Sequence, residues 1–166
     1  MPELFERHRE TLQHAVEAAH ARGYWTPYPE MPSGRIYGET AKADGEAAFQ
    51  SLLNAPFDID QPTTGGRVGK EDSPYGFALG TTYPAADPIA LVTAAKTAGK
   101  AWGAASVETR VGICLEILDR INKQSFLMAN AVMHTSGQSF MMAFQAGGPH
   151  AQDRGLEAVA YAYDEM

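Results

Sequence analysis

The stretch that decides the fold is DPIALVTAAKTAGKAWGAASVETRVGICLEILDRI, residues 87–121. It opens with Asp87 followed by Pro88. This pair is typical of a helix start, because aspartate accepts hydrogen bonds from free N–H groups and proline is tolerated in the first turn. Apolar side chains then recur every three or four residues over 91–102 and again over 111–121. This spacing predicts two consecutive amphipathic helices.

The same periodicity predicts helices on the N-terminal side of this stretch. We expect one at about 3–22, stopped by Gly23. Another is expected at 39–54, because Pro56 blocks further extension. The apolar face of this second helix is assigned to Ala43, Ala47, Ala48, Leu52 and Leu53.

Towards the C-terminus the pattern stays helical. Ser106 is placed as the cap of the second long helix, and a further helix over 126–133 is punctuated by Gly137. After a break at 145–149, a final helix carries Leu156, Val159, Ala160 and Tyr163. This helix runs to Met166 with no glycine, asparagine, proline or basic last turn to end it, which leaves a truncated chain open as a hypothesis.

Two segments lack helical periodicity. Residues 24–32, YWTPYPEMP, contain three prolines and three aromatic residues, so an extended backbone is expected. The rings are expected to seal this segment onto the core, with a peptide-docking surface as the alternative. Residues 66–76 and 77–84 favour two short strands around a Pro/Gly turn. Together these patterns predict a mostly α-helical fold with a small β element, in which 1–86 and 87–166 form one structural unit.

The composition excludes several classes of protein. The 166 residues suffice for one ordinary domain, and 13 basic against 20 acidic residues give a net charge of −7. That balance argues against binding to nucleic-acid phosphates and to anionic membranes. The single cysteine, Cys114, excludes an internal disulfide, and no apolar run is long enough to span a bilayer. We therefore expect a cytoplasmic protein.

No catalytic or metal-binding motif stands out. The glycine-rich run 65–71 lacks the spacing and the hydroxyl of a phosphate loop, and no dinucleotide fingerprint follows a strand. His8, His14 and His20 repeat every six residues and so do not converge on one side of a helix, which argues against a zinc site. Cys114 is expected to be a buried, unreactive thiol.

Two further patterns each allow two interpretations. Arg154 and Glu157 form an i,i+3 pair on the last helix; a solvated ion pair is the simpler interpretation, and an anion contact near a substrate path is the alternative. Four methionines fit either a deformable binding groove or, as we favour, the filling of a core. They are Met128, Met133, Met141 and Met142.

The order of features in the C-terminal half resembles the N-terminal region of the aldehyde dehydrogenase superfamily. Thr135-Ser136-Gly137-Gln138 stands where most members carry Glu, Thr, Gly and Lys, and 157–163 is similar to the tyrosine-rich helix that follows. A narrower match, over 24–32 and 133–154, is to the PaaN-type enzymes of phenylacetic acid degradation. The residues that fit the family's first two long helices are Ala94, Ala95, Ala98, Trp102, Arg110, Leu115 and Leu118.

The resemblance implies an enzyme that oxidises an aldehyde to the acid with NAD or NADP. Its suggested substrate is a CoA-linked semialdehyde released by ring opening. Family members place the catalytic cysteine, the general-base glutamate, the oxyanion-hole asparagine and the Rossmann strands after the region matched here. No catalytic, cofactor-binding or metal-binding residue is therefore assigned, and this chain alone is expected to be inactive and free of cofactor. Its expected partner is the rest of the dehydrogenase chain, and a homo-oligomer is left open.

The resemblance also implies that the substrate entrance lies beside the start of the last helix. It places Ala151 and Arg154 near the mouth and makes Phe140, Met141 and Phe144 candidates for an apolar lining. A cation at Arg154 would suit CoA phosphates or a carboxylate. The alternative hypothesis is an autonomous helical interaction module without enzymatic activity.

Overall fold

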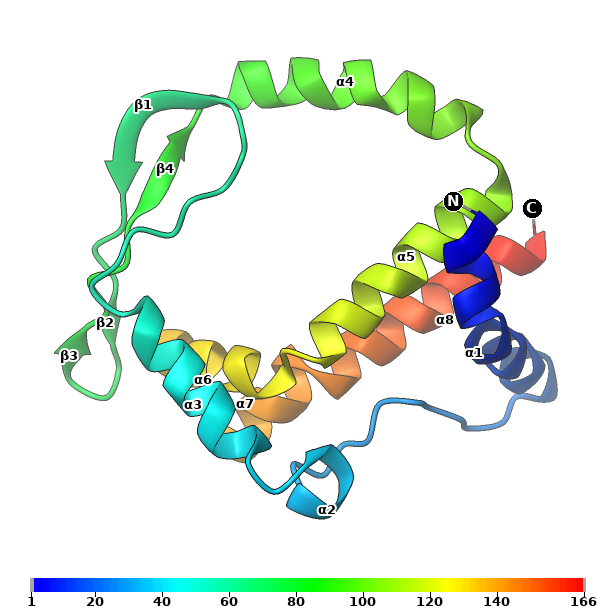
Figure 1. The fold of residues 1–166 in the computed structure, drawn as a ribbon, viewed down its shortest axis with the longest axis horizontal. Helices are drawn as coiled ribbons and strands as arrows, with labels where there is room; N and C mark the ends of the chain where they lie inside the picture. Colours follow the sequence, from blue (N-terminus) through cyan, green and yellow to red (C-terminus); the bar gives the residue numbers. More distant parts are fainter. Residues whose placement is uncertain (1, 166) are drawn as a thin grey trace.

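The computed structural model describes residues 2–165, whose helices and strands follow one another around a ring (Figure 1). The fold is mostly helical with a small β element, as predicted. The helices are α1 (Pro2–Ala21), α2 (Gly34–Tyr37), α3 (Ala41–Leu52), α4 (Pro88–Ala104), α5 (Val107–Asn122), α6 (Ser125–Ser136), α7 (Phe140–Gly147) and α8 (Pro149–Glu165). The strands are β1 (Thr63–Val68), β2 (Asp72–Ser73), β3 (Phe77–Ala78) and β4 (Tyr83–Ala86).

One side of the ring is a helical core formed by α1, α5 and α8 (Figure 1). Helix α1 lies very close to α5 at Gly112, where an added Cβ would come within 2.6 Å of the backbone nitrogen of Phe5. This close approach lets the apolar stripes of the three helices bury one another. The buried residues of this core are Phe5, Leu12, Tyr28, Val111, Leu115 and Leu156.

A buried carboxylate also joins α1 to α5. Glu116, which is 8% exposed, accepts hydrogen bonds from His8 Nε2 at 2.9 Å, from Arg120 Nε at 2.8 Å and from Arg7 Nη1 at 3.2 Å. The bond from His8, followed by the bond from Arg120, lowers the pKa of Glu116 to about 2. The carboxylate is therefore ionised at neutral pH, and ionisation strengthens its bonds to both arginines.

The opposite side of the ring is a second core, in which α3 and α7 both pack against α6. Its centre is Phe144, whose ring meets Tyr37 of α2 edge-on at 5.5 Å between centroids. This packing corrects the predicted face of the helix at 39–54. Helix α3 buries Gly45 and Phe49, exposes Ala43 and Ala47, and leaves Ala48 and Leu52 partly buried. Its buried face is centred on Gly45, where α6 lies so close that an added Cβ would clash with the α6 backbone.

The β element connects the two sides. β1 pairs with β4 and β2 pairs with β3, both antiparallel, so the two predicted strands are four shorter ones. The β1–β4 register shifts between Thr63 and Arg67, where Gly65 has a positive φ of 85°. Gly69 and Gly80, which also have positive φ, lie in the two connections between the strand pairs. The β2–β3 tip lies on α6, where Ser73 Oγ is 3.0 Å from His134 Nδ1.

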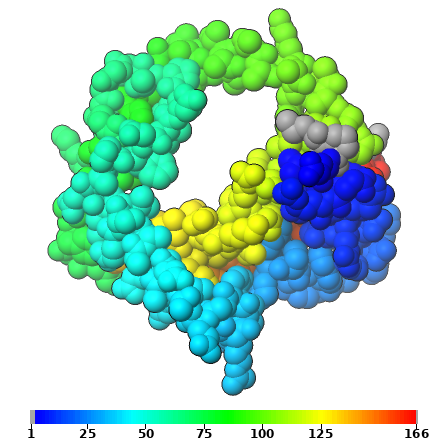
Figure 2. All heavy atoms as spheres, in the orientation of Figure 1, coloured from blue at the N-terminus to red at the C-terminus, as the bar shows by residue number. Residues whose placement is uncertain are grey.

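Helix α4 closes the ring between β4 and α5 (Figure 1). Asp87 accepts hydrogen bonds from the backbone nitrogens of Ile89 and Ala90, and Ser106 accepts one from Thr109, which confirms both predicted caps. No side chain of α4 is buried, and Figure 2 shows an opening through the molecule beneath it. None of the helices within residues 2–165 has the length and apolar character needed to cross a membrane.

Two helix ends differ from the prediction. Gly23 donates to the carbonyl of Ala18 at 2.9 Å, so Arg22, and not Gly23, takes the left-handed conformation that closes α1, with φ 50°. The break predicted at 145–149 shrinks to Gly148, because α7 ends at Gly147 and α8 begins at Pro149. Gly137 does end α6 in the left-handed region, with φ 76°.

The ionised state of Glu116 makes a prediction about pH. Because folding lowers this pKa from 4.5 to about 2, the carboxylate stabilises the fold above pH 4.5, and the contribution is lost as the pH falls towards 2. We expect Glu116→Gln to lower the free energy of unfolding at pH 7 and to matter progressively less below pH 4.5, as measured by urea unfolding. Glu10→Gln, on an exposed part of α1, is the control. A deficit of Glu116→Gln that is as large at pH 3 as at pH 7 would contradict this account.

The close contact of α1 with α5 makes a second prediction. Gly112→Ala should lower the free energy of unfolding by about 1–3 kcal/mol, because the new methyl group pushes against the α1 backbone. Gly99→Ala in α4 is the matched control, since an added Cβ there meets nothing within 4 Å. That change should stabilise the chain by about 0.5–1 kcal/mol through helix propensity. Thermal or urea unfolding measures both, and equal effects would exclude a tight α1–α5 contact.

Candidate functional site

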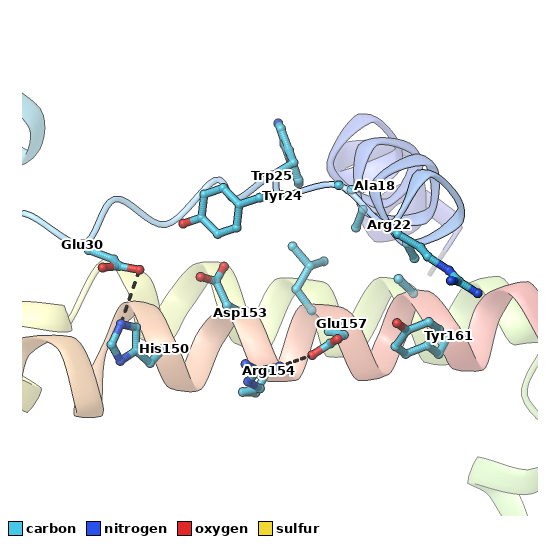
Figure 3. A pocket seen from close by; sticks show the side chains of 15 residues that line it. Ala18, Arg22, Tyr24, Trp25, Glu30, His150, Asp153, Arg154, Glu157 and Tyr161 are labelled. Carbon is cyan, nitrogen blue, oxygen red and sulfur yellow. Dashed lines mark hydrogen bonds and ion pairs between the residues drawn. The ribbon is translucent and has the colours of Figure 1, made fainter.

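A cleft of about 610 Å³ lies between α1, α8 and the segment that joins α1 to α2 (Figure 3). We call it the α1–α8 cleft. Helix α1 contributes Ala15, Ala18, Ala19 and Arg22; residues 23–30 contribute Gly23, Tyr24, Trp25 and Glu30. Helix α8 contributes His150, Asp153, Arg154, Leu156, Glu157, Ala160 and Tyr161. Small apolar residues thus lie beside aromatic and charged ones, and the volume falls in the range of small-molecule sites.

The wall formed by residues 23–30 is anchored to α8. The hydroxyl of Thr26 donates to Asp153 and accepts a hydrogen bond from the backbone nitrogen of Tyr28 at 2.9 Å. The Tyr28 ring is buried in the α1–α5–α8 core, and that burial, reinforced by the charges of Asp153 and Asp119, raises the pKa of its hydroxyl to about 12. The phenol therefore stays neutral, and this wall is held at fixed points on the helical core.

The three carboxylates of the cleft all have partners. Glu30 lies 3.4 Å from His150 Nε2, and Glu157 lies 2.6 Å from Arg154 Nη1. Asp153 accepts from the Thr26 hydroxyl, but burial is the larger effect and raises its pKa. The pairing of Arg154 with Glu157 agrees with the simpler interpretation of this pair, a solvated ion pair, because both side chains are largely exposed.

The three aromatic residues of 24–32 were expected to seal this segment onto the core, and only Tyr28 does so. Tyr28 is buried, whereas Tyr24 is 79% exposed and Trp25 is also exposed, with its ring 5.1 Å from that of His14. Rings on a well-anchored segment that find no full cover within residues 2–165 are available for contacts with another molecule. The many prolines and aromatic residues of 24–32 were the sequence signal for this exposed wall, and they underlie the alternative of a docking surface.

The predicted entrance residues do not form one surface. Arg154 lines the α1–α8 cleft, and Ala151 is exposed on the same helix. Phe140 and Met141 begin α7, with Met141 exposed and Phe140 partly buried. Phe144 requires a correction: it is 0% exposed, so it cannot line an entrance in this structure, because the aromatic rings of α2 and α6 enclose it.

Two other predictions about side chains also need correction. Cys114 is partly exposed on α5 and is not fully buried. Met128, Met141 and Met142 are exposed, so core filling is wrong for them in this structure. Within residues 2–165, no group of three or more histidine, cysteine, aspartate or glutamate side chains could hold a metal ion.

Large apolar side chains are also exposed on α4 and α5, two helices that border the ring. On α4, Ile89 is 78% exposed, and Val92 and Trp102 are exposed as well. On α5, Ile117 and Ile121 are exposed one turn apart. Exposed apolar side chains in such numbers are typical of a surface that another polypeptide covers.

Comparison with known proteins gives one informative match. No family model matches the chain, and no curated protein matches it. Among solved structures, the crystal structure of an NAD-dependent aldehyde dehydrogenase from Burkholderia multivorans is 56% identical in sequence over 98% of this chain, with a TM-score of 0.93. This chain spans 29% of the length of that structure.

This match confirms the resemblance to the aldehyde dehydrogenase superfamily and the predicted fold class. It leaves the narrower resemblance to the PaaN-type enzymes as a prediction. In sequence and in fold, the chain is similar to the N-terminal part of an NAD-dependent aldehyde dehydrogenase.

Proposed function

We propose that this chain is the N-terminal part of an enzyme that oxidises an aldehyde to the corresponding acid with NAD. The observation that carries the proposal is the 56% identity over 98% of the chain to an NAD-dependent aldehyde dehydrogenase. NAD is favoured over NADP because the solved relative is an NAD-dependent aldehyde dehydrogenase. NAD supplies a hydride acceptor when bound, and it would be held by the rest of the enzyme.

The uncovered apolar side chains of α4 and α5 support this proposal. Ile89 and Trp102 on α4, and Ile117 on α5, would each leave water if the rest of the enzyme packed against them. Complete burial of a fully exposed large apolar side chain is favourable by roughly 1.5–3 kcal/mol, and these side chains would gain the share that corresponds to their exposed fraction. We therefore propose that the partner of this chain is the rest of the dehydrogenase. The chain alone is proposed to be inactive, because the family's catalytic cysteine and general-base glutamate follow the region matched here.

The finer assignment follows from the motifs. Residues 24–32 and 133–154 resemble the PaaN-type enzymes of phenylacetic acid degradation, so the proposed substrate is a CoA-linked semialdehyde in the cytoplasm. Arg154, Ala151, Phe140 and Met141 remain the proposed entrance residues. An anionic substrate would have to draw Arg154 away from Glu157, an exchange that the exposure of this pair permits.

The competing function is an autonomous helical interaction module. The observation in its favour is the α1–α5–α8 core, which buries Leu12 and Leu115 without help from another chain. Such a module would cover its own apolar surface, and the exposed side chains of α4 speak against it. The enzyme part is therefore the better supported of the two.

The proposal predicts the size and activity of the natural protein. We expect the polypeptide isolated from its own cell to be much longer than 166 residues and to reduce NAD when an aldehyde is added. The 166-residue chain alone should reduce none and should strongly enhance the fluorescence of a dye that binds apolar surface. Intact mass, NADH absorbance and dye fluorescence measure these outcomes. A natural protein of 166 residues that binds little dye would favour the interaction module instead.

The entrance assignment predicts a specific kinetic effect. In the longer enzyme, Arg154→Ala should raise KM for a CoA-linked aldehyde by about three- to tenfold, because an exposed charge contact is worth about 1 kcal/mol. KM for a small neutral aldehyde should stay unchanged. Arg35→Ala, at an exposed arginine outside the α1–α8 cleft, is the matched control. An equal change in KM for both aldehydes would contradict the assignment of Arg154 to the substrate entrance.

A further inference from the structure

One end of the α1–α8 cleft holds a cation, Arg22, that pairs with no side chain among residues 2–165. Figure 3 shows Arg22 and Tyr161 at this end, and Glu30 with His150 at the other. The guanidinium of Arg22 forms no hydrogen bond or ion pair with the side chains of residues 2–165. Tyr161, on α8, is 52% exposed. An open cation thus lies beside an open aromatic face.

The backbone of Arg22 is unusual for an arginine. Arg22 occupies the position after α1 that closes the helix in the left-handed region, with φ 50°, where glycine is favoured. The backbone nitrogen of Gly23, the next residue, donates to the carbonyl of Ala18 at 2.9 Å. The glycine therefore lies one residue after the left-handed position, and Arg22 has to adopt that unfavourable backbone conformation itself. One explanation for an arginine here is that its charge offsets the negative end of the α1 dipole. That effect does not require a left-handed backbone or a position in a cleft, so it does not account for these two features of Arg22.

The carboxylates of the cleft do not neutralise Arg22. Glu30 is engaged by His150 at 3.4 Å, and Glu157 is engaged by Arg154 at 2.6 Å. Asp153 accepts from the Thr26 hydroxyl, and Figure 3 shows it below Tyr24, away from Arg22. A ligand phosphate at Arg22 therefore meets a free cation, with a second guanidinium, Arg154, further along α8.

From these features we infer that the α1–α8 cleft binds an adenine nucleotide. Arg22 pairs with a phosphate, and the purine stacks on an exposed ring, Tyr161 or Tyr24, over the small side chains of the cleft floor. Stacking on aromatic faces and pairing with guanidinium are the usual contacts of such ligands. If the proposed function holds, the nucleotide end of a CoA-linked aldehyde is one source of this ligand, and a free adenine nucleotide or NAD is another.

Trp25 provides a direct measurement, because it lines the cleft and the chain has only two tryptophans. In a Trp102→Phe background, titration of the chain with adenosine 3′,5′-bisphosphate should change the fluorescence of Trp25 and saturate, with calorimetry as a second readout. We expect Arg22→Gln to weaken binding by about tenfold, and Arg22→Lys to weaken it less. Arg35→Gln is the matched control and should leave binding unchanged. Circular dichroism establishes that each variant is folded.

AMP and NAD distinguish the sources. Tighter binding of the bisphosphate assigns the site to CoA, whereas equal or tighter binding of AMP or NAD keeps a nucleotide site and rejects CoA as its source. The inference is overturned if the bisphosphate, AMP and NAD all fail to bind at millimolar concentration, or if Arg22→Gln binds as well as the parent chain. Aldehyde oxidation by the longer enzyme is measured separately, so the proposed function and this inference can fail independently.

Discussion

The contact between α1 and α5 is the constraint on which the rest of the structure depends. At Gly112 the two helices come so close that no side chain fits between them, and one turn further along α5 the Glu116 carboxylate binds His8 and Arg7 of α1. Helix α1 in turn carries the 23–30 segment, whose Tyr28 enters the same core. If α1 separated from α5, the α1–α8 cleft would lose two of its three walls.

Apolar side chains are buried in two cores of the molecule, whereas those of α4 are left uncovered. The two cores bury their central side chains, with Leu12 1% exposed and Phe144 0% exposed. Helix α4 buries none, although its caps and its helical pattern are sound. A helix that is well capped but buries none of its side chains indicates that another part of a larger protein packs against it. That combination is the physical reason for proposing that this chain is part of a larger enzyme.

The candidate site shows why a cleft is harder to predict than a helix. Its walls come from 15–30 and 150–161, which are far apart in the sequence and meet only because α1 and α8 pack on the same side of α5. The sequence points to Arg154 and to the aromatic segment 24–32 separately, and nothing in it places them together. The resemblance to the aldehyde dehydrogenases made Phe144 a candidate for the entrance lining, and the sequence could not correct this, because an apolar residue near the surface and one in a core have the same signature.

The sequence alone determined the mostly helical fold class and the starts of α4 and α5, because both depend on local chemistry. Asp87 and Ser106 cap their helices through bonds that reach only two or three residues ahead, and a three-to-four residue spacing is visible in any window of the chain. Tertiary structure alone decided which face of α3 is buried and which aromatics of 24–32 stay in water. The buried face of α3 depends on how closely α6 approaches Gly45, and the exposure of the rings depends on where α1 and α8 lie, and no local pattern encodes these positions.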